Sequence, residues 1–302
     1  MADTEATPQH ANKPQPLHNA GLRLVIPTLR DPRVMVAVAQ TLWVVLGQTT
    51  YYFNRDPVQL AAAIGTAVVL DFVLTLVVLR QIAVPLSAYL TGLSIGILLE
   101  SYDWRIFVVA SGWGILSKYL VRNRKRHFFN PSNFGLVTAL LLCPLIATIA
   151  PGSQWGADYR VAVVIIVLGL LMMKRVDRLH LAVAWLAGYA MMGGVRMALG
   201  QGGLVFALGP MTGAEFALFT FVMLPDPKAS PGTRRARIHW GLSIAVLDGC
   251  MRYLEIRYSM FFSLFIHSAM LSLVHWITSR HDLGEASYRR FWDAAIGRAS
   301  RE

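Results

Sequence analysis

The chain has 302 residues, of which 55% are hydrophobic and only 15% are charged, and its mean hydropathy is +0.48. This composition is typical of an integral membrane protein and excludes an ordinary soluble domain. The net charge of +11 would also suit nucleic-acid binding. We expect no nucleic-acid partner, however, because most basic residues lie in short loops between apolar segments.

The N-terminal residues 1–30 form a polar lead without the basic start and apolar stretch of a signal peptide. We expect this cytoplasmic lead to be disordered or interfacial. Residues 31–280 are interpreted as a single transmembrane domain. Residues 281–302 are expected to form a cytoplasmic amphipathic tail, because their aromatic and aliphatic residues recur at helical spacing.

Ten segments of the chain are predicted to be membrane-spanning helices from their length and apolar character. With the N-terminus in the cytoplasm, 22 of the 28 Lys and Arg residues fall on the cytoplasmic side, as the positive-inside rule requires. Both termini are then cytoplasmic, and the surrounding partner is membrane lipid. The predicted spans are residues 34–53, 58–79, 83–99, 104–121, 131–150, 159–175, 179–199, 209–224, 236–252 and 258–278.

An internal repeat is indicated by the third and eighth spans, which are both short and both contain Thr-Gly, at Thr91 and Thr212. The fifth span, NPSNFGLVTALLL, has a counterpart in the tenth, FSLFIHSAMLSLV. Each pair is five spans apart, and an odd offset reverses the direction through the membrane. The pattern predicts two inverted five-helix repeats, residues 31–155 and 156–280, with a binding site where the interrupted helices meet.

The fifth span begins with the polar sequence NPSN. Asn130 is predicted to cap the helix, Pro131 suits the first helical position, and Asn133 falls in the first turn beside unpaired backbone N–H groups. Such a helix start attracts phosphate and polar carbonyl groups. An ordinary Asn-Pro cap after a basic loop is the alternative interpretation.

The eighth span ends in LPDPKASP, where prolines stiffen the chain. Asp226, Lys228 and Ser230 offer an acceptor, a cation and a hydroxyl, and the predicted topology places them on the same side of the membrane as NPSN. The alternative interpretation is a rigid loop that carries positive-inside charges.

Three carboxylates lie inside predicted spans, where a charge is costly and is usually paired or functional. Asp71 has no evident partner, Glu215 lies near Arg196 in the predicted topology, and we regard these two and Asp248 as candidates for an ion or proton site. His267 and His275 are about 12 Å apart along one helix, so they do not present two axial ligands to one haem. The cysteines and histidines indicate no metal site.

Four blocks of sequence, PLSAYLTGLSIGILL, SKYLVRNRKRHFFNPSNFG, FVMLPDPKASP and FFSLFIHSAML, occur in this order. Together they resemble the RnfD/NqrB membrane subunits of ion-translocating Rnf and Na⁺-pumping NADH:quinone oxidoreductase complexes. The chain is most similar to short stand-alone members of that superfamily, including those encoded in enediyne-type biosynthetic clusters.

The resemblance implies an all-α fold of ten helices in two inverted repeats, also likened to urea transporters, in the bacterial inner membrane. It further implies a flavin cofactor. The S-x-A-T type motif that carries covalent FMN is absent, and the loop after the NPSN helix is only PGSQWGADYR, so the expected cofactor is non-covalent riboflavin or FMN. Redox or biosynthetic-cluster proteins are the implied partners. The implied site residues are Ser87, Thr91, Asn130, Asn133, Asp226, Lys228 and Ser230, with Thr212 as the repeat counterpart of Thr91.

Three functions follow as hypotheses. The first is a membrane electron-transfer subunit whose flavin does the chemistry while the protein supplies burial and hydrogen bonds. The second is a transporter of a small polar solute, or of flavin itself, through the same site between the repeats. The third is a scaffold protein whose polar helix ends have no ligand.

Overall fold

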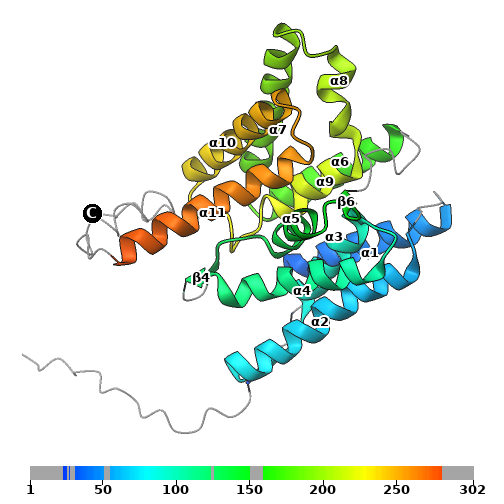
Figure 1. Ribbon diagram of the computed structural model, residues 1–302, viewed down its shortest axis with the longest axis vertical. Coiled ribbons are helices and arrows are strands. Elements are labelled where there is room, and N and C mark those ends of the chain that lie inside the picture. Colours follow the sequence, from blue (N-terminus) through cyan, green and yellow to red (C-terminus); the bar gives the residue numbers. More distant parts are fainter. Residues whose placement is uncertain are drawn as a thin grey trace, which may run out of the picture.

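Helices make up most of the protein, as the apolar composition predicts (Figure 1). The structure is a computed structural model, and it describes residues 23–25, 27, 31–50, 55–123, 126–149 and 159–280. The expected tail at 281–302 lies outside the described residues, as does most of the expected lead at 1–30. Each of the ten predicted spans coincides with a helix or with a bent pair of helices.

The first half of the chain contains five helices, which appear in blue to green in Figure 1, with α2 and α4 in the lower part of that view. Prolines set two of their boundaries, because α3 begins directly after Pro85 and α5 stops two residues before Pro144. These helices are α1 (Pro32–Thr50), α2 (Pro57–Leu79), α3 (Leu86–Leu98), α4 (Trp104–Leu120) and α5 (Pro131–Leu142).

The second half has a bent element where the eighth span was predicted. Two short helices and two irregular turns replace a straight helix there, and α7, α8 and α10 occupy the upper part of Figure 1. The elements are α6 (Tyr159–Arg175), α7 (Leu179–Ala198), α8 (Leu204–Leu208), the 3₁₀ turn η1 (Gly209–Thr212), α9 (Ala214–Leu218), the π-helical turn η2 (Phe219–Met223), α10 (Arg234–Tyr253) and α11 (Ser259–Arg280).

Three pairs of very short strands join loops to one another. Arg23–Val25 (β1), part of the lead expected to be disordered or interfacial, pairs in parallel with Gln81–Ala83 (β2) after α2. Backbone hydrogen bonds therefore fix at least this part of the lead. The other pairs are antiparallel: Leu99–Glu100 (β3) with Thr148–Ile149 (β6), and Arg122–Asn123 (β4) with Arg126–His127 (β5).

Among the described residues, two helices, α2 and α7, are long and apolar enough to cross a membrane. A third span is formed if the bent pair Leu204–Thr212 and Glu215–Met223, which meet at 65°, is taken as one. Helices α3 and α5 and the Ser259–Val274 part of α11 are apolar but shorter. The structure thus supports a helical protein in which a few helices can cross a membrane, and the ten spans stay a prediction.

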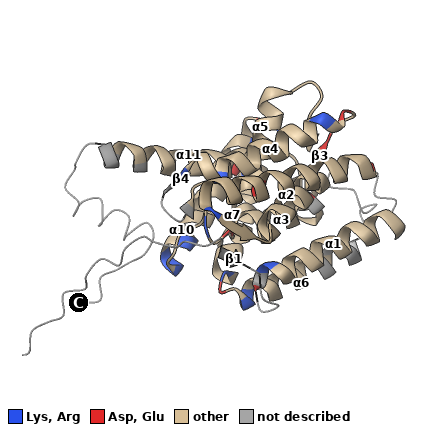
Figure 2. Ribbon diagram, turned by 90° about the horizontal axis from the view of Figure 1, so that it is seen from below, with Lys and Arg blue, Asp and Glu red and all other residues tan. Residues whose placement is uncertain are grey.

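Charged residues gather near helix ends over much of the molecule. Figure 2 shows α1 and α11 with little charge along their length, whereas α10 begins with several basic residues. Many large apolar side chains on α1, α2 and α6 are exposed. Apolar outer faces of this kind suit contact with lipid and would be unfavourable in water.

Corresponding helices of the two halves pack in the same order. In the first half α2 packs against α4, α4 against α5, and α1 against α3. In the second half α7 packs against α10, α10 against α11, and α6 against α9 and η2. The correspondence is partial, because α2 also packs extensively against α3, whereas α7 has little contact with η2.

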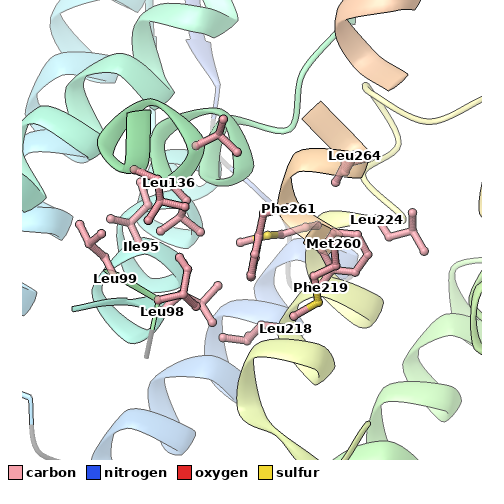
Figure 3. Close-up of a cluster of buried hydrophobic side chains, with 14 of the residues drawn as sticks. Ile95, Leu98, Leu99, Leu136, Leu218, Phe219, Leu224, Met260, Phe261 and Leu264 are labelled. Atoms are coloured by element: carbon pink, nitrogen blue, oxygen red, sulfur yellow. The ribbon is translucent and has the colours of Figure 1, made fainter. Parts of the chain in front are cut away.

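A shared apolar core joins the two halves. Figure 3 shows side chains of α3 and α5, such as Ile95 and Leu136, facing side chains of α9, η2 and α11, such as Leu218, Phe219 and Phe261. The helices that meet between the halves are short or broken. Because a short helix ends inside the molecule, its polar ends lie close to the centre.

Glycines allow α4 and α5 to approach closely. A Cβ atom at Gly114 would lie 2.5 Å from the carbonyl oxygen of Pro131, and one at Gly135 would collide with the carbonyl oxygen of Ala110. Small residues of this kind let helix backbones pack closely in membranes. The close contact fixes where the polar start of α5 sits.

Replacing Gly135 with alanine should lower the thermal unfolding midpoint in detergent. The added methyl group meets backbone that cannot rotate away, and overpacking of this kind costs about 1–3 kcal/mol. Gly112→Ala is the matched control, because a Cβ at that position of α4 meets nothing within 4 Å. Equal midpoints for the two variants would contradict the close contact of α4 with α5.

Candidate functional site

The start of α5 has the capped geometry that the sequence predicts. The side-chain oxygen of Asn130 accepts a hydrogen bond of 3.0 Å from the backbone N–H of Asn133, and Pro131 occupies the first helical position. Both asparagines are buried. One of the unpaired N–H groups of the helix start is thereby satisfied, and the side-chain amides point to the second half of the chain.

The two asparagine amides join the halves of the molecule. Asn130 Nδ2 donates to Asp226 Oδ2 at 3.2 Å, and Asn133 Nδ2 donates to the carbonyl oxygen of Phe261 in α11 at 3.2 Å. Asn133 Oδ1 is buried and accepts no hydrogen bond from the residues that the structure describes. An acceptor without a donor is costly inside a protein, so this oxygen is where a ligand donor would be most stabilising.

The DPKASP segment folds into a tight turn around Asp226. Its Oδ1 accepts from the backbone N–H of Lys228 at 2.9 Å, and its carbonyl oxygen accepts from the Ser230 hydroxyl at 2.7 Å. Arg178, from the loop before α7, donates to Ser230 Oγ at 2.6 Å and to the carbonyl oxygen of Pro231 at 3.3 Å. The turn is thus held rigidly and carries Lys228 on its exposed side.

Cationic groups surround this turn. His127 Nε2 lies 4.0 Å from Asp226 Oδ2, and Arg33 is attracted electrostatically to the same carboxylate. Arg33 also pairs with Asp31 at 2.6 Å; hydrogen bonding in that pair raises the pKa of Arg33 and lowers that of Asp31.

We call Asn130, Asn133, Asp226, Lys228 and Ser230 the Asp226 cluster.

A buried ion pair lies beside the cluster. Lys118 Nζ donates to Asp71 Oδ1 at 2.8 Å and to Ser87 Oγ at 2.9 Å, which joins α4 to α2 and α3. The Tyr119 hydroxyl also donates to Asp71 Oδ1, at 3.0 Å. Lys118 acts electrostatically on Asp226 and Lys228. Thr91 follows one turn after Ser87 on α3, and its hydroxyl donates to the Ser87 carbonyl oxygen at 2.9 Å.

The remaining candidates have contacts elsewhere. Thr212 is exposed, and its hydroxyl donates within its own turn. Asp248 accepts from Arg252 at 2.8 Å and from Ser259 at 2.6 Å, so it ties α10 to the start of α11. Arg252, rather than the expected Arg196, is the cation that acts on Glu215. Arg196 lies over the ring of Phe206.

Sequence reasoning missed Lys118 and Arg178. Lys118 looked like one more positive-inside charge at the end of a span, yet its side chain is 11% exposed. The signal was present, because a lone carboxylate in α2 needs a partner, and Lys118 is the basic residue in the last turn of the neighbouring helix α4. Arg178 gave no such signal.

Comparison of the chain with models of known protein families finds no match, and comparison with curated proteins finds none either. The likeness to the RnfD/NqrB subunits therefore stays an interpretation of the four sequence blocks. The geometry of the site has to carry the functional argument.

The Asp71–Lys118 pair should show strong coupling in unfolding measurements. Asp71→Asn or Lys118→Met alone leaves a buried group without its partner, which costs about 3–5 kcal/mol. The double variant should be more stable than the sum predicts, by about 1–3 kcal/mol. The exposed Asp31–Arg33 pair is the control, with coupling below about 1 kcal/mol. Additive effects at Asp71 and Lys118 would show that the two side chains do not meet.

Proposed function

We propose that this chain is a membrane electron-transfer protein that binds riboflavin or FMN non-covalently at the Asp226 cluster. The observation that carries the proposal is that Asn130 and Asn133, at the start of α5, hydrogen-bond to Asp226 and Phe261 in the second half of the chain, while Asn133 Oδ1 is buried and accepts no hydrogen bond from the described residues. The resemblance to RnfD/NqrB subunits supplies the identity of the cofactor. Ten spans in two inverted repeats, with both termini cytoplasmic in a bacterial inner membrane, belong to the same proposal.

The repeat proposal is supported by three helix pairings of the first half that recur in the second. The topology is supported by where the loops meet. The segments after α4, before α7 and after η2 converge at the Asp226 cluster, and all of them are predicted to be cytoplasmic. Midplane sites between inverted repeats are commonly built from interrupted helices, and α3, α5 and the α8–η2 element have that form.

The polar groups in and around the cluster are of the chemical types that bind a flavin. Asn133 Oδ1 is an acceptor suited to an N–H of the isoalloxazine ring, and Lys228, Lys118 and Arg178 are cations suited to its carbonyl oxygens or to a phosphate. When bound, the flavin would supply the electron-transfer chemistry.

The protein groups would bind and tune that cofactor. The start of α5 carries the positive end of the helix dipole, and Lys228 adds a charge at the open side of the turn. Both favour a group that gains negative charge on reduction. The apolar core between the halves would keep water away from the ring.

Purified protein from flavin-replete cells should carry stoichiometric flavin that acid precipitation releases into the supernatant. Asn133→Ala should reduce the flavin content at least tenfold, because the variant loses the buried amide oxygen that is proposed to accept a hydrogen bond from the flavin. Ser132→Ala is the matched control, because this neighbouring side chain is equally buried but lies outside the cluster. Folded, colourless wild-type protein would contradict the proposal.

A second candidate function is transport of a small polar solute. The observation that favours it is that the molecule has a polar feature at each end of α5: the Asp226 cluster at its start and an open cleft at its last turn. Alternating access in inverted-repeat transporters uses two such ends around one site.

Transport predicts uptake into liposomes that Asn133→Ala abolishes and Ser132→Ala leaves intact. Riboflavin and urea are the first solutes to test, because the resemblance names flavin-binding and urea-transporter folds. Uptake equal to that of empty liposomes for both solutes would remove this candidate. A third variant replaces Asn130, Asn133 and Asp226 together. If it keeps both its flavin content and its uptake, the result would favour a scaffold role.

A further inference from the structure

A cleft of about 900 Å³ lies at the opposite end of α5 from the Asp226 cluster. Helix α5 begins at the cluster, whereas Leu140 in its last turn lines the cleft. Leu140 comes ten residues after Asn130 and seven after Asn133, so the two features are about 11–15 Å apart along the helix. The cleft is therefore separate from the proposed flavin site, and it has the size of a ligand site.

The walls of the cleft combine an apolar base with several polar side chains. Leu140, Ala147 and Phe262 are apolar, while Arg55, Glu100, Thr148, Arg257 and Tyr258 bring two guanidinium groups, a carboxylate and two hydroxyls. A few convergent polar groups over an apolar base are what a small-molecule site requires.

Arg55 is the most unusual of these groups, because it is only 6% exposed. Burial lowers the pKa of Arg55, and the carboxylate of Glu100 acts in the opposite direction. A guanidinium group has five N–H donors in a planar fork that matches a carboxylate. A second cation, Arg257, is exposed at the same cleft.

The backbone around Tyr258 is strained in a way that places its side chain at the cleft. Tyr258 has a φ of +58°, which a residue with a Cβ rarely adopts. Its hydroxyl hydrogen-bonds to Thr148 on β6, across from Glu100 on β3. Strain of this kind persists where surrounding structure enforces it, and such positions cluster at functional sites.

Helix starts add to the preference for an anion. Helix α2 begins after Asp56 and α11 begins after Tyr258, and both of these residues line the cleft. The carboxylate of Asp56 is used to cap α2 through the N–H of Val58 at 2.8 Å. The positive ends of two helix dipoles and two arginines therefore face the cleft, against two carboxylates: that of Glu100, which is partly exposed, and that of Asp56, which is already engaged in capping α2.

We propose that this cleft is a second ligand site, which binds a small organic acid. Arg55 and Arg257 hold the carboxylate, Tyr258 and Thr148 supply hydroxyl contacts, and the body of the ligand lies against Phe262 and Leu140. The site does not depend on the flavin proposal. In the predicted topology all the loops that form it lie outside the cytoplasm, so the ligand would arrive from that side.

The test is a titration of the purified full-length protein with succinate, followed by the thermal unfolding midpoint. A ligand that binds only the folded state raises the midpoint with a saturable dependence on its concentration. Succinate should do so, and Arg257→Gln should weaken its apparent affinity about tenfold, as expected for loss of a charge-assisted hydrogen bond. Arg257 is exposed, so this variant should fold.

Arg105→Gln is the matched control, because Arg105 is exposed in the first turn of α4 at the same end of the molecule but does not line the cleft. Its affinity for succinate should equal that of the wild type. The proposal is overturned if succinate gives no saturable shift, if Arg257→Gln binds as tightly as wild type, or if inorganic phosphate binds more tightly than succinate. Flavin content should be the same in both variants, so failure here is distinguishable from failure of the flavin proposal.

Discussion

The polar start of α5 is the constraint on which the rest of the structure depends. A helix start leaves backbone N–H groups unpaired, and inside an apolar protein those groups need partners. Asn130 satisfies one of them and binds Asp226, while Asn133 reaches the backbone of α11. One turn of helix therefore links the loop after η2 and the beginning of α11 to the first half. The close contact of α4 with α5 at Gly114 and Gly135 holds that turn in place.

The position of the start of α5 explains why polar and charged groups lie at both ends of a largely apolar molecule. At one end the rigid turn of Asp226 lies near basic residues of several elements, and the buried Lys118, which acts on Asp226 electrostatically, binds Asp71 and Ser87. At the other end, α5 stops early because of Pro144, and the short strands β3 and β6 pair with each other. The apolar core of Figure 3 lies between these two polar ends of the molecule. The second asparagine, with an unpartnered oxygen, also lies between them.

Much of this arrangement could be predicted from sequence, because it depends on local rules. Apolar segments marked the helices, and NPSN predicted the cap, the first-turn proline and the position of Asn133. Counting the predicted spans placed Asp226 and Asn130 on the same side of the membrane, and the structure brings their side chains into contact.

What could not be predicted depends on how helices rotate against one another. The pairing of Asp71 with Lys118 requires a particular rotation of α4 on α2, and the contact of Arg252 with Asp248 left Arg196 to pack on Phe206. Hydrogen bonds to backbone, such as that from Asn133 to Phe261, leave no trace in residue types. The lengths of α3 and α5 were overestimated because apolar residues continue across the prolines that bound these helices, Pro85 before α3 and Pro144 after α5.

The central claim is that flavin binds at the Asp226 cluster, and the reduction potential of the bound flavin in Lys228→Gln protein tests it most directly. Lys228 is exposed, so the variant should fold and retain flavin, and Arg105→Gln, at an exposed position in the first turn of α4 at the opposite end of the molecule, serves as the control. The account predicts a potential lowered by about 30 mV, which for a two-electron couple corresponds to about 1.4 kcal/mol of lost stabilisation of the reduced form. A potential equal to that of the wild type would place the flavin elsewhere.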